Sequence, residues 1–429
     1  MAGEEAVVAL QAGLPYAALA AVSIALAAIM AGVLGVWLYF LAYMVRSFRL
    51  APRLDSFDRS KASGSRRPKV SVILPARNEE PYIARCLDSL LAQDYPDFEI
   101  VAVNDCSSDR TGQIMQEYAA RDRRVVYVEN LPKPEGWAGK TWACHQGYLR
   151  ARGDYLMFTD ADTEHAPDAM SLAVAHMLAE ELDALTAVPR LVCNDFWTRI
   201  TLPGLSTFLH TRFSPLRVND PRHKTGYFFG SFFVITRKTY EAVGTHEGVR
   251  QELVEDGALG ARVKAGGHAM KMVRGEDRIE AVWARDLDTL WHGLRRLVIP
   301  LYHQDRKGAH LIAAAVFFIM FAPFLFLSYS VPAFLATFLA AADDVSAIAS
   351  SVLLGIELST IAVLMAATAV QSKLGVFQSP AYALGAPLGG ALIYFGFASA
   401  IVDAGKQGAV NWRGRRYTVS EKQSFLRSV

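Results

Sequence analysis

Two aspartates that stand one residue apart are the clearest chemical signal in the chain. Asp160 and Asp162 come just after residues 155–158, a short apolar run rich in β-forming residues. Such a run predicts a buried strand, and open parallel sheets bind ligands beyond the carboxyl ends of their strands. Carboxylate oxygens suit Mg²⁺ or Mn²⁺, which often hold phosphates as well. The motif predicts a metal site, although a solvated loop that caps the next helix explains it equally well.

The elements that must position this motif alternate between strands and helices from residue 69 to about residue 275. The predicted elements, in chain order, are strand 70–74, helix 81–93, strand 98–103, helix 109–120, strand 125–128, helix 140–150 and strand 155–158. This alternation is typical of a parallel sheet with helices on both faces. The carboxyl ends of its strands, and therefore the two aspartates, would lie along one edge.

The composition indicates a membrane protein. Hydrophobic residues make up 52% of the 429 residues, and they gather towards both ends of the chain. The stretch from about Leu14 to Val45 can span a bilayer with some tilt. Basic residues follow it from Arg46 onwards, so the positive-inside rule places the next region in the cytoplasm. The net charge of +2 gives no sign of a nucleic-acid partner.

The C-terminal third contains three apolar segments whose topology conflicts with the charge of the tail. They cover about 310–341, 346–370 and 381–403, and a basic tail follows them. Three crossings from a cytoplasmic domain would leave this tail outside, whereas its charge predicts that it stays inside. A break at Pro323 or Pro332, or one re-entrant segment, would remove the conflict.

Four motifs, in order, resemble those of family 2 glycosyltransferases with a GT-A fold. They are Pro-Ala-Arg-Asn-Glu-Glu at 75–80, Asn-Asp-Cys-Ser-Ser-Asp at 104–109, Asp-Ala-Asp at 160–162 and Glu-Asp at 255–256. The resemblance covers about residues 69–300. Two further stretches, 136–143 and 412–417, resemble the membrane-bound branch that glycosylates lipids. This branch includes hopanoid-associated and carotenoid glycosyltransferases and, more distantly, ceramide glucosyltransferase.

The resemblance implies an α/β GT-A domain, Rossmann-like and of the nucleotide-diphospho-sugar transferase type, with N- and C-terminal transmembrane helices. The implied layout is a transmembrane helix at 1–48, a basic linker at 49–68, a cytoplasmic GT-A domain at 69–285, an amphipathic interfacial helix at 286–308, transmembrane helices at 309–405 and a basic cytoplasmic tail at 406–429. The protein would then be an integral membrane protein of the cell membrane whose catalytic domain is cytoplasmic.

The implied function is an inverting glycosyltransferase that depends on Mn²⁺ or Mg²⁺. It would move a sugar from a nucleotide-sugar, with UDP-sugar as the expected donor, to a lipid or isoprenoid acceptor in the bilayer. Two alternatives remain open, a processive polysaccharide synthase and an inactive scaffold or transporter. Residues 292–296 depart from the Q-x-x-R-W motif of many membrane-bound relatives, which disfavours the synthase. Intact acidic residues at 160, 162 and 256 disfavour the inactive protein.

The resemblance also assigns residues to roles. Asp256 is the expected base and Glu255 its neighbour in the catalytic pair, while Asp160 and Asp162 bind the metal. The acceptor side has Gly230, in a strand that a ligand can approach closely, and Trp291, on the interfacial helix. The expected donor-binding residues are Pro75, Ala76, Arg77, Asn78, Glu79, Asp105, Lys140, Asp160, Arg295 and Arg296.

Simpler roles compete with three of these assignments. Asp105 could merely stabilise a turn, and Lys140 could be an exposed lysine at a helix start. The Glu255 and Asp256 pair could interact only with the dipole of the helix that it begins.

Overall fold

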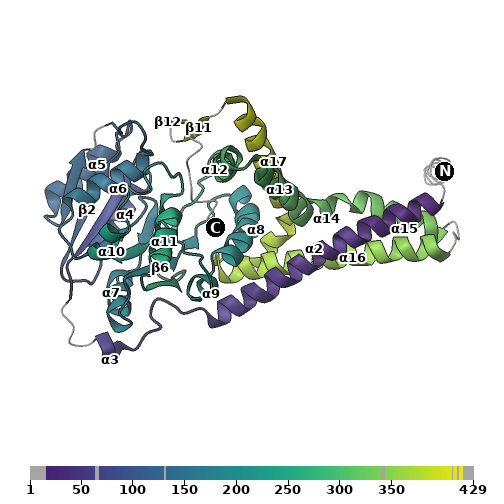
Figure 1. Cartoon of the computed structure of the whole chain (residues 1–429), viewed down its shortest axis with the longest axis horizontal. Helices are drawn as coiled ribbons and strands as arrows, with labels where there is room; N and C mark the ends of the chain where they lie inside the picture. The colour runs from purple at the N-terminus through teal and green to yellow at the C-terminus, as the bar shows by residue number, and fades with distance from the viewer. Residues whose placement is uncertain are drawn as a thin grey trace. The chain divides into compact units, whose positions relative to one another are not determined.

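The computed structural model describes residues 16–62, 67–129, 132–339, 344–407, 409–412 and 415–418 (Figure 1). Residues 1–15 of the predicted first transmembrane segment lie outside the described residues, and so do residues 419–429 of the predicted basic tail. The described chain divides into two units. The helical unit comprises Met1–Arg46, Phe196–Thr211 and Lys307–Ser399, and the α/β unit comprises Ser47–Asp195, Arg212–Arg306 and Ala400–Val429.

A seven-stranded sheet forms the centre of the α/β unit. Its order is β3 (Val125–Glu129), β2 (Phe98–Asn104), β1 (Val70–Ala76), β4 (Tyr155–Phe158), β8 (Phe233–Thr236), β6 (Ala184–Val188) and β9 (Met270–Arg274). Every residue of β1 and β2 is buried, as expected for strands that are covered on both faces. The predicted α/β fold is confirmed, but β8 runs antiparallel to both of its neighbours, so the sheet is mixed rather than wholly parallel.

Alternate residues of β1 enter two different hydrophobic cores because neighbouring side chains in a strand point to opposite faces. Val72 and Leu74 join the core that includes residues of α4 (Ile83–Leu91) and α7 (Ala169–Ala179). Ile73 joins the core that includes residues of α6 (Gly139–Arg150) and α11 (Glu255–Ala265). Helices therefore cover both faces of the sheet. The remaining helices of this unit are α3 (Arg59–Ala62), α5 (Thr111–Arg121), α9 (Pro215–Val218), α10 (Arg237–Ala242) and α12 (Leu287–Gln304).

A smaller sheet begins directly after Asp162. Its strands are β5 (Thr163–His165), β10 (Ile279–Ala281) and β7 (Arg190–Leu191), in that order. The backbone N–H of Val282, just after β10, donates to the carbonyl of Asp162 at 3.2 Å. This small sheet therefore fixes the chain on the far side of the aspartate pair.

The first part of the segment that the sequence predicts as a linker at 49–68 packs onto the α/β unit. Leu54 is only 1% exposed, and its backbone N–H donates to the carbonyl of Arg274. Arg53 also forms an ion pair with Asp277 at 2.6 Å. This part packs onto the α/β unit because it contains a leucine and a paired arginine among its polar residues. Residues 63–66 lie outside the described residues.

In the helical unit, two long helices run in the same direction and a third runs against them. The hydroxyl of Ser346, near the start of α16 (Asp344–Leu374), donates to the carbonyl of Tyr16, the first residue of α2 (Tyr16–Leu50), at 3.0 Å. Near their other ends, Met44 of α2 and Gln371 of α16 both bond residues of α8 (Phe196–Arg212). The two helices therefore run side by side in the same direction (Figure 1). Helix α15 (Leu327–Leu339) runs antiparallel to α16, since Ser330 bonds Glu357 whereas the later Thr337 bonds the earlier Ser350, at 2.7 Å.

The first predicted C-terminal apolar segment is interrupted. Helix α13 (Arg306–Val316) passes into a π-helical turn, Phe317–Phe321, and then into the short α14 (Ala322–Leu325), in which Pro323 lies. The last apolar segment forms a 3₁₀ turn, Pro380–Gly385, and α17 (Ala386–Gln407). Two short strands follow, β11 (Ala409–Trp412) and β12 (Arg415–Thr418). Four described helical stretches are long and apolar enough to cross a membrane: Tyr16–Leu50, Arg306–Leu325, Asp344–Leu374 and Pro380–Gly405.

Candidate active site

The loops after β1 and β2 interlock at the carboxyl edge of the main sheet. The guanidinium of Arg77 donates to the carbonyls of Asp105 and Cys106 at 2.7 and 2.8 Å. The side chain of Asn78 accepts from the backbone N–H of Ser108 at 2.8 Å. Asn78 and Cys106 have positive φ angles of 54° and 55°, which asparagine tolerates better than most residues. The structure therefore brings the predicted donor-binding loop, including Pro75 and Ala76 at the end of β1, against the buried Asp105.

Glu79 forms an ion pair that the sequence does not reveal. Its carboxylate is almost fully buried and bonds to Arg285, whose guanidinium also lies over the ring of Tyr82 at 4.7 Å. Burial raises the pKa of Tyr82, Arg285 opposes this increase, and Asp162 adds to it. Arg285 thus places a cation close to the aspartate pair. No motif singles it out, because it follows β10 in a stretch of ordinary composition.

Lys140 connects two of the predicted acidic residues. Its ammonium lies 2.7 Å from Oδ1 of Asp160 and 2.7 Å from Oε1 of Glu255. These three residues come from the start of α6, the end of β4 and the start of α11. Burial lowers the pKa of Lys140, but Asp160, Glu255 and Asp256 outweigh it and raise this pKa well above its ordinary value. Lys140 is therefore a positive charge held at the acidic cluster.

Asp256 is held by two backbone donors at the start of α11. Its Oδ2 accepts from the N–H of Gly230 at 2.7 Å, and its Oδ1 accepts from the N–H of Gly257 at 2.8 Å. Burial, and then the charge of Glu255, raise the pKa of Asp256 to about 6, although Lys140 opposes the increase. A carboxylate whose pKa lies near neutrality is well suited to accept and release a proton.

Gly230 leaves room for this cluster. A Cβ at this position would lie 2.7 Å from Oδ2 of Asp256, 2.9 Å from Nζ of Lys140 and 3.1 Å from Oδ2 of Asp160. Each distance is shorter than ordinary contact, so any larger residue would push the charged groups apart. The sequence predicts Gly230 on the acceptor side, and the structure places it directly beside Asp256, Lys140 and Asp160.

The residues present fit a divalent cation. The structure describes no group of three or more His, Cys, Asp and Glu side chains placed to hold a metal. Asp160 and Asp162 nevertheless offer two carboxylates at a strand end, and Mg²⁺ is commonly bound by one or two carboxylates together with substrate phosphates. The ammonium of Lys140 against Asp160 shows that a cation is stable at this position.

The two arginines predicted to bind the donor differ in their surroundings. Arg295 pairs with Asp403 at the end of α17, so the structure does not bring it to the acidic cluster. Burial and the charge of Asp256 raise the pKa of Tyr227, whereas Arg296 lies close enough to this tyrosine for its charge to lower that pKa. Trp291, on the same helix, is half-buried. Arg296 and Tyr227 therefore lie beside the acidic cluster, whereas Arg295 pairs with Asp403.

The structure combines a mixed, Rossmann-like sheet of the GT-A type with an aspartate pair after β4 and an acidic pair at the start of α11. Residues 71–244 match the family described as "Glycosyl transferase family 2".

Two curated relatives agree with this class. The chain is 40% identical over 116 residues to the uncharacterized glycosyltransferase EpsJ of Bacillus subtilis, covering 27% of this chain and 31% of that protein. It is 28% identical over 202 residues to 4,4'-diaponeurosporenoate glycosyltransferase of Staphylococcus aureus, covering 45% of this chain and 50% of that protein. The chain thus spans half or less of the length of these relatives.

A solved structure, the mannosyltransferase PcManGT of Pyrobaculum calidifontis in complex with GDP-Man and Mn²⁺, aligns with 86% of this chain and 98% of its own. The identity is 19% and the TM-score 0.47.

Proposed function

We propose that this protein transfers a single sugar from a nucleotide-sugar, with a UDP-sugar as the expected donor, to a hydroxyl of a membrane lipid, with inversion at the sugar. The observation that carries the proposal is the cluster of Asp160, Lys140, Glu255 and Asp256 in a chain whose described residues include four apolar helical stretches. The name of the Staphylococcus aureus relative adds support, since that protein is named as a glycosyltransferase of 4,4'-diaponeurosporenoate.

The donor would bind along the carboxyl edge of the main sheet. The loop from Pro75 to Glu79 and the side chain of Asp105 would hold the nucleoside, because Arg77 already ties these two loops together. Lys140 and Arg296 would face the diphosphate. A positive charge in a partly dry site stabilises a leaving diphosphate more than it would in water.

The chemical step would be a single displacement. Asp256 takes the proton of the acceptor oxygen, this oxygen bonds to the anomeric carbon, and the bond from that carbon to the diphosphate breaks. A general base must lie within hydrogen-bond reach of its proton and have a pKa near the working pH. Asp256 meets the second condition, and Gly230 and Gly257 hold its carboxylate in one orientation.

Asp160 and Asp162 would hold Mn²⁺ or Mg²⁺, which supplies Lewis-acid stabilisation of the diphosphate. Lys140 bonds Asp160 before the donor arrives, and it would then turn towards the phosphates. Glu255 would keep the lysine at the site throughout, since it bonds the same ammonium.

A direct test uses the purified full chain in detergent with Mn²⁺, a panel of labelled nucleotide-sugars and a lipid extract. We expect one lipid-soluble product that carries one sugar, identified by mass spectrometry. Long sugar polymers would instead identify a polysaccharide synthase. Absence of both binding and hydrolysis for every nucleotide-sugar would overturn the proposal.

A further inference from the structure

The segment 226–230 runs along one side of α11, the helix that begins with the acidic pair. A Cβ on Gly260 would lie 2.6 Å from the carbonyl carbon of Tyr227 and 2.8 Å from its Cα. At the other end of the segment, the N–H of Gly230 bonds the carboxylate of Asp256 at 2.7 Å. Residues four apart in a helix lie on the same side of it, so Asp256 and Gly260 both face this segment. The chain therefore brings Tyr227 to the side of α11 that carries Asp256.

Three aromatic residues form a surface at this place, which we call the aromatic ridge: Phe213, Tyr227 and Phe229. The rings of Phe213 and Tyr227 stack at 4.2 Å and 25°, and the ring of Phe229 meets that of Tyr227 edge-on at 5.2 Å. All three side chains are half-buried, whereas Phe228 lies fully in the core. Part of the aromatic surface of the ridge is therefore open to a ligand.

The hydroxyl of Tyr227 is the polar group of the ridge. It takes part in none of the hydrogen bonds among the residues that the structure describes. Burial raises the pKa of Tyr227, and among the surrounding charges that of Asp256 raises it most. The hydroxyl thus lies near the expected base with its hydrogen-bonding capacity unused. A tyrosine suits a site for an apolar alcohol, because its ring is apolar and its hydroxyl is polar.

Two polar side chains that contact the segment 226–230 are already bonded within the protein. The hydroxyl of Thr186 accepts from the N–H of Phe229 and donates to a carbonyl of the same loop, both at 3.0 Å. The ammonium of Lys264 donates to the carbonyl of Val218 at 2.7 Å. A sugar ring would need partners for several hydroxyls, whereas the ridge offers aromatic faces and one uncommitted hydroxyl. Its complement is an apolar carbon chain that ends in a single hydroxyl.

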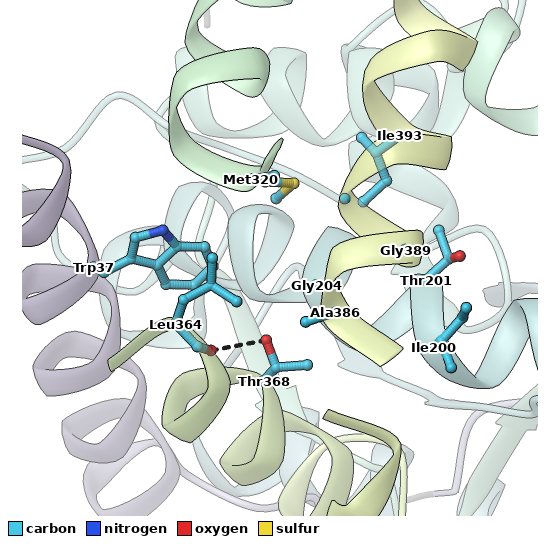
Figure 2. A pocket seen from close by; sticks show the side chains of 11 residues that line it. Trp37, Ile200, Thr201, Gly204, Met320, Leu364, Thr368, Ala386, Gly389 and Ile393 are labelled. Carbon is cyan, nitrogen blue, oxygen red and sulfur yellow. Dashed lines mark hydrogen bonds between the residues drawn. The ribbon is translucent and has the colours of Figure 1, made fainter. Parts of the chain in front are cut away.

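A space in the helical unit is a poorer candidate for binding a lipid acceptor. It lies among Trp37, Thr201, Gly204 and Ile393 (Figure 2). It has room for about one water molecule, which is far less than a hydrocarbon chain occupies. The carbon chain next to the reacting hydroxyl must therefore bind elsewhere, and the ridge lies directly beside the expected base.

We propose that the aromatic ridge binds the carbon chain of the acceptor next to its reacting hydroxyl, and that Tyr227 donates a hydrogen bond to the oxygen of this hydroxyl. The same oxygen would donate its proton to Asp256, so the two side chains together orient it for attack. The acceptor is then a lipid alcohol rather than a lipid that already carries a sugar. This proposal rests on the proposed function, because it takes Asp256 as the base. Binding of an apolar alcohol at the ridge can be measured without sugar transfer.

The test uses the full chain in lipid nanodiscs and two photoactivatable probes, farnesol with a diazirine in its chain and the matching hydrocarbon without the hydroxyl. After irradiation, mass spectrometry maps the labelled peptides. We expect the alcohol probe to label residues 213–229, and unmodified farnesol to abolish this labelling. Labelling confined to the apolar helices of the helical unit would overturn the proposal.

Two competitors test the class of acceptor. Octyl glucoside, an alkyl chain that ends in a sugar, should displace the alcohol probe less well than farnesol does. Farnesyl phosphate should also displace it less well, although the guanidinium of Arg212 lies 5.9 Å from the ring centroid of Phe213. Stronger displacement by either compound than by farnesol would assign the ridge to another class of acceptor and contradict the proposal.

Two variants separate the hydroxyl from the rings. Tyr227→Phe keeps the stacked ring, so labelling by the alcohol probe should fall about threefold to tenfold, while labelling by the hydrocarbon should stay the same. Its matched control is Tyr118→Phe, because the hydroxyl of Tyr118 bonds Asp88 at 2.6 Å elsewhere in the α/β unit. Phe213→Leu removes the stack and should weaken labelling by both probes. Equal labelling of the Tyr227 and Tyr118 variants by the alcohol would contradict the assigned bond.

Activity then separates this proposal from the proposed function. With farnesol as acceptor, Tyr227→Phe should raise the KM for farnesol about threefold to tenfold over that of Tyr118→Phe, with the donor affinity the same in both variants. Specific labelling of the ridge without sugar transfer from any nucleotide-sugar would retain the ridge as a site for an apolar alcohol and remove the glycosyltransferase function. Sugar transfer with one KM for farnesol in both variants would retain that function and remove the role of Tyr227.

Discussion

The ammonium of Lys140 lies 2.7 Å from Oδ1 of Asp160, the first carboxylate of the Asp-x-Asp motif. A second contact of the same length ties this lysine to Glu255, next to the expected base. One side chain therefore links the Asp-x-Asp motif to the pair Glu255 and Asp256. In the absence of donor, Lys140 and a divalent cation would compete for Asp160.

This competition gives the first prediction. Lys140→Met removes the competing charge, so Mn²⁺ should bind more tightly to the donor-free protein, by up to about fivefold, because a partly exposed ion pair contributes about 1 kcal/mol or less. Titration calorimetry without donor measures this affinity. Lys271→Met is the matched control, since Lys271 pairs with Glu180 elsewhere in the α/β unit. Weaker Mn²⁺ binding by the Lys140 variant would show that this lysine supports the metal site.

The pH dependence of turnover follows from the pKa of Asp256. Its carboxyl group is protonated below a pKa of about 6, which is raised from the ordinary value, and only the carboxylate can accept a proton. Turnover should therefore fall about tenfold per pH unit below 6 and level off above it. Lys140 lowers the pKa of Asp256, so in Lys140→Met the midpoint of this curve should move to higher pH. A midpoint that moves to lower pH would contradict the assigned contact.

Metal removal supplies the third prediction. Excess EDTA should abolish sugar transfer, and added Mn²⁺ or Mg²⁺ should restore it. Asp162→Asn loses a charged ligand, so both donor affinity and turnover should fall by at least about tenfold. Equilibrium dialysis with labelled donor measures the affinity. Full activity of this variant in EDTA would reject Asp162 as a metal ligand.

The side of the membrane on which the tail lies is the fourth prediction. Helix α16 runs parallel to α2, so both end on the side where α2 leads into the α/β unit. Helix α17 starts just after α16 and ends with Asp403 paired to Arg295 of α12, within the α/β unit. We therefore expect α17 not to cross, which gives two crossings after the α/β unit and a cytoplasmic tail. A reporter fused after Val429 that is active only outside the cell would contradict this.

The sequence predicts local structure well because strand and helix patterns depend on neighbouring residues. The position of β4 and the Asp160 and Asp162 pair after it follow from its apolar run. The direction of β8 could not be predicted, since strand polarity depends on how distant segments meet. For the same reason the contact between Lys140 and Glu255 was not predicted, because 114 positions separate two residues that only the folded sheet brings together. The pairing of Arg295 with Asp403 likewise joins distant helices.

Asp256→Asn tests the central claim, that this carboxylate is the base for transfer of a sugar to a lipid. Asparagine keeps the size of the side chain and can still accept from Gly230, but it does not take a proton at neutral pH. The measurement is the rate of transfer from labelled donor to lipid acceptor, with donor affinity measured on the same preparation. We predict a loss of turnover of about 10²–10⁴-fold and a change in donor affinity of only a few-fold. Near-normal turnover, or a loss of donor binding as large as that of Asp162→Asn, would contradict the claim.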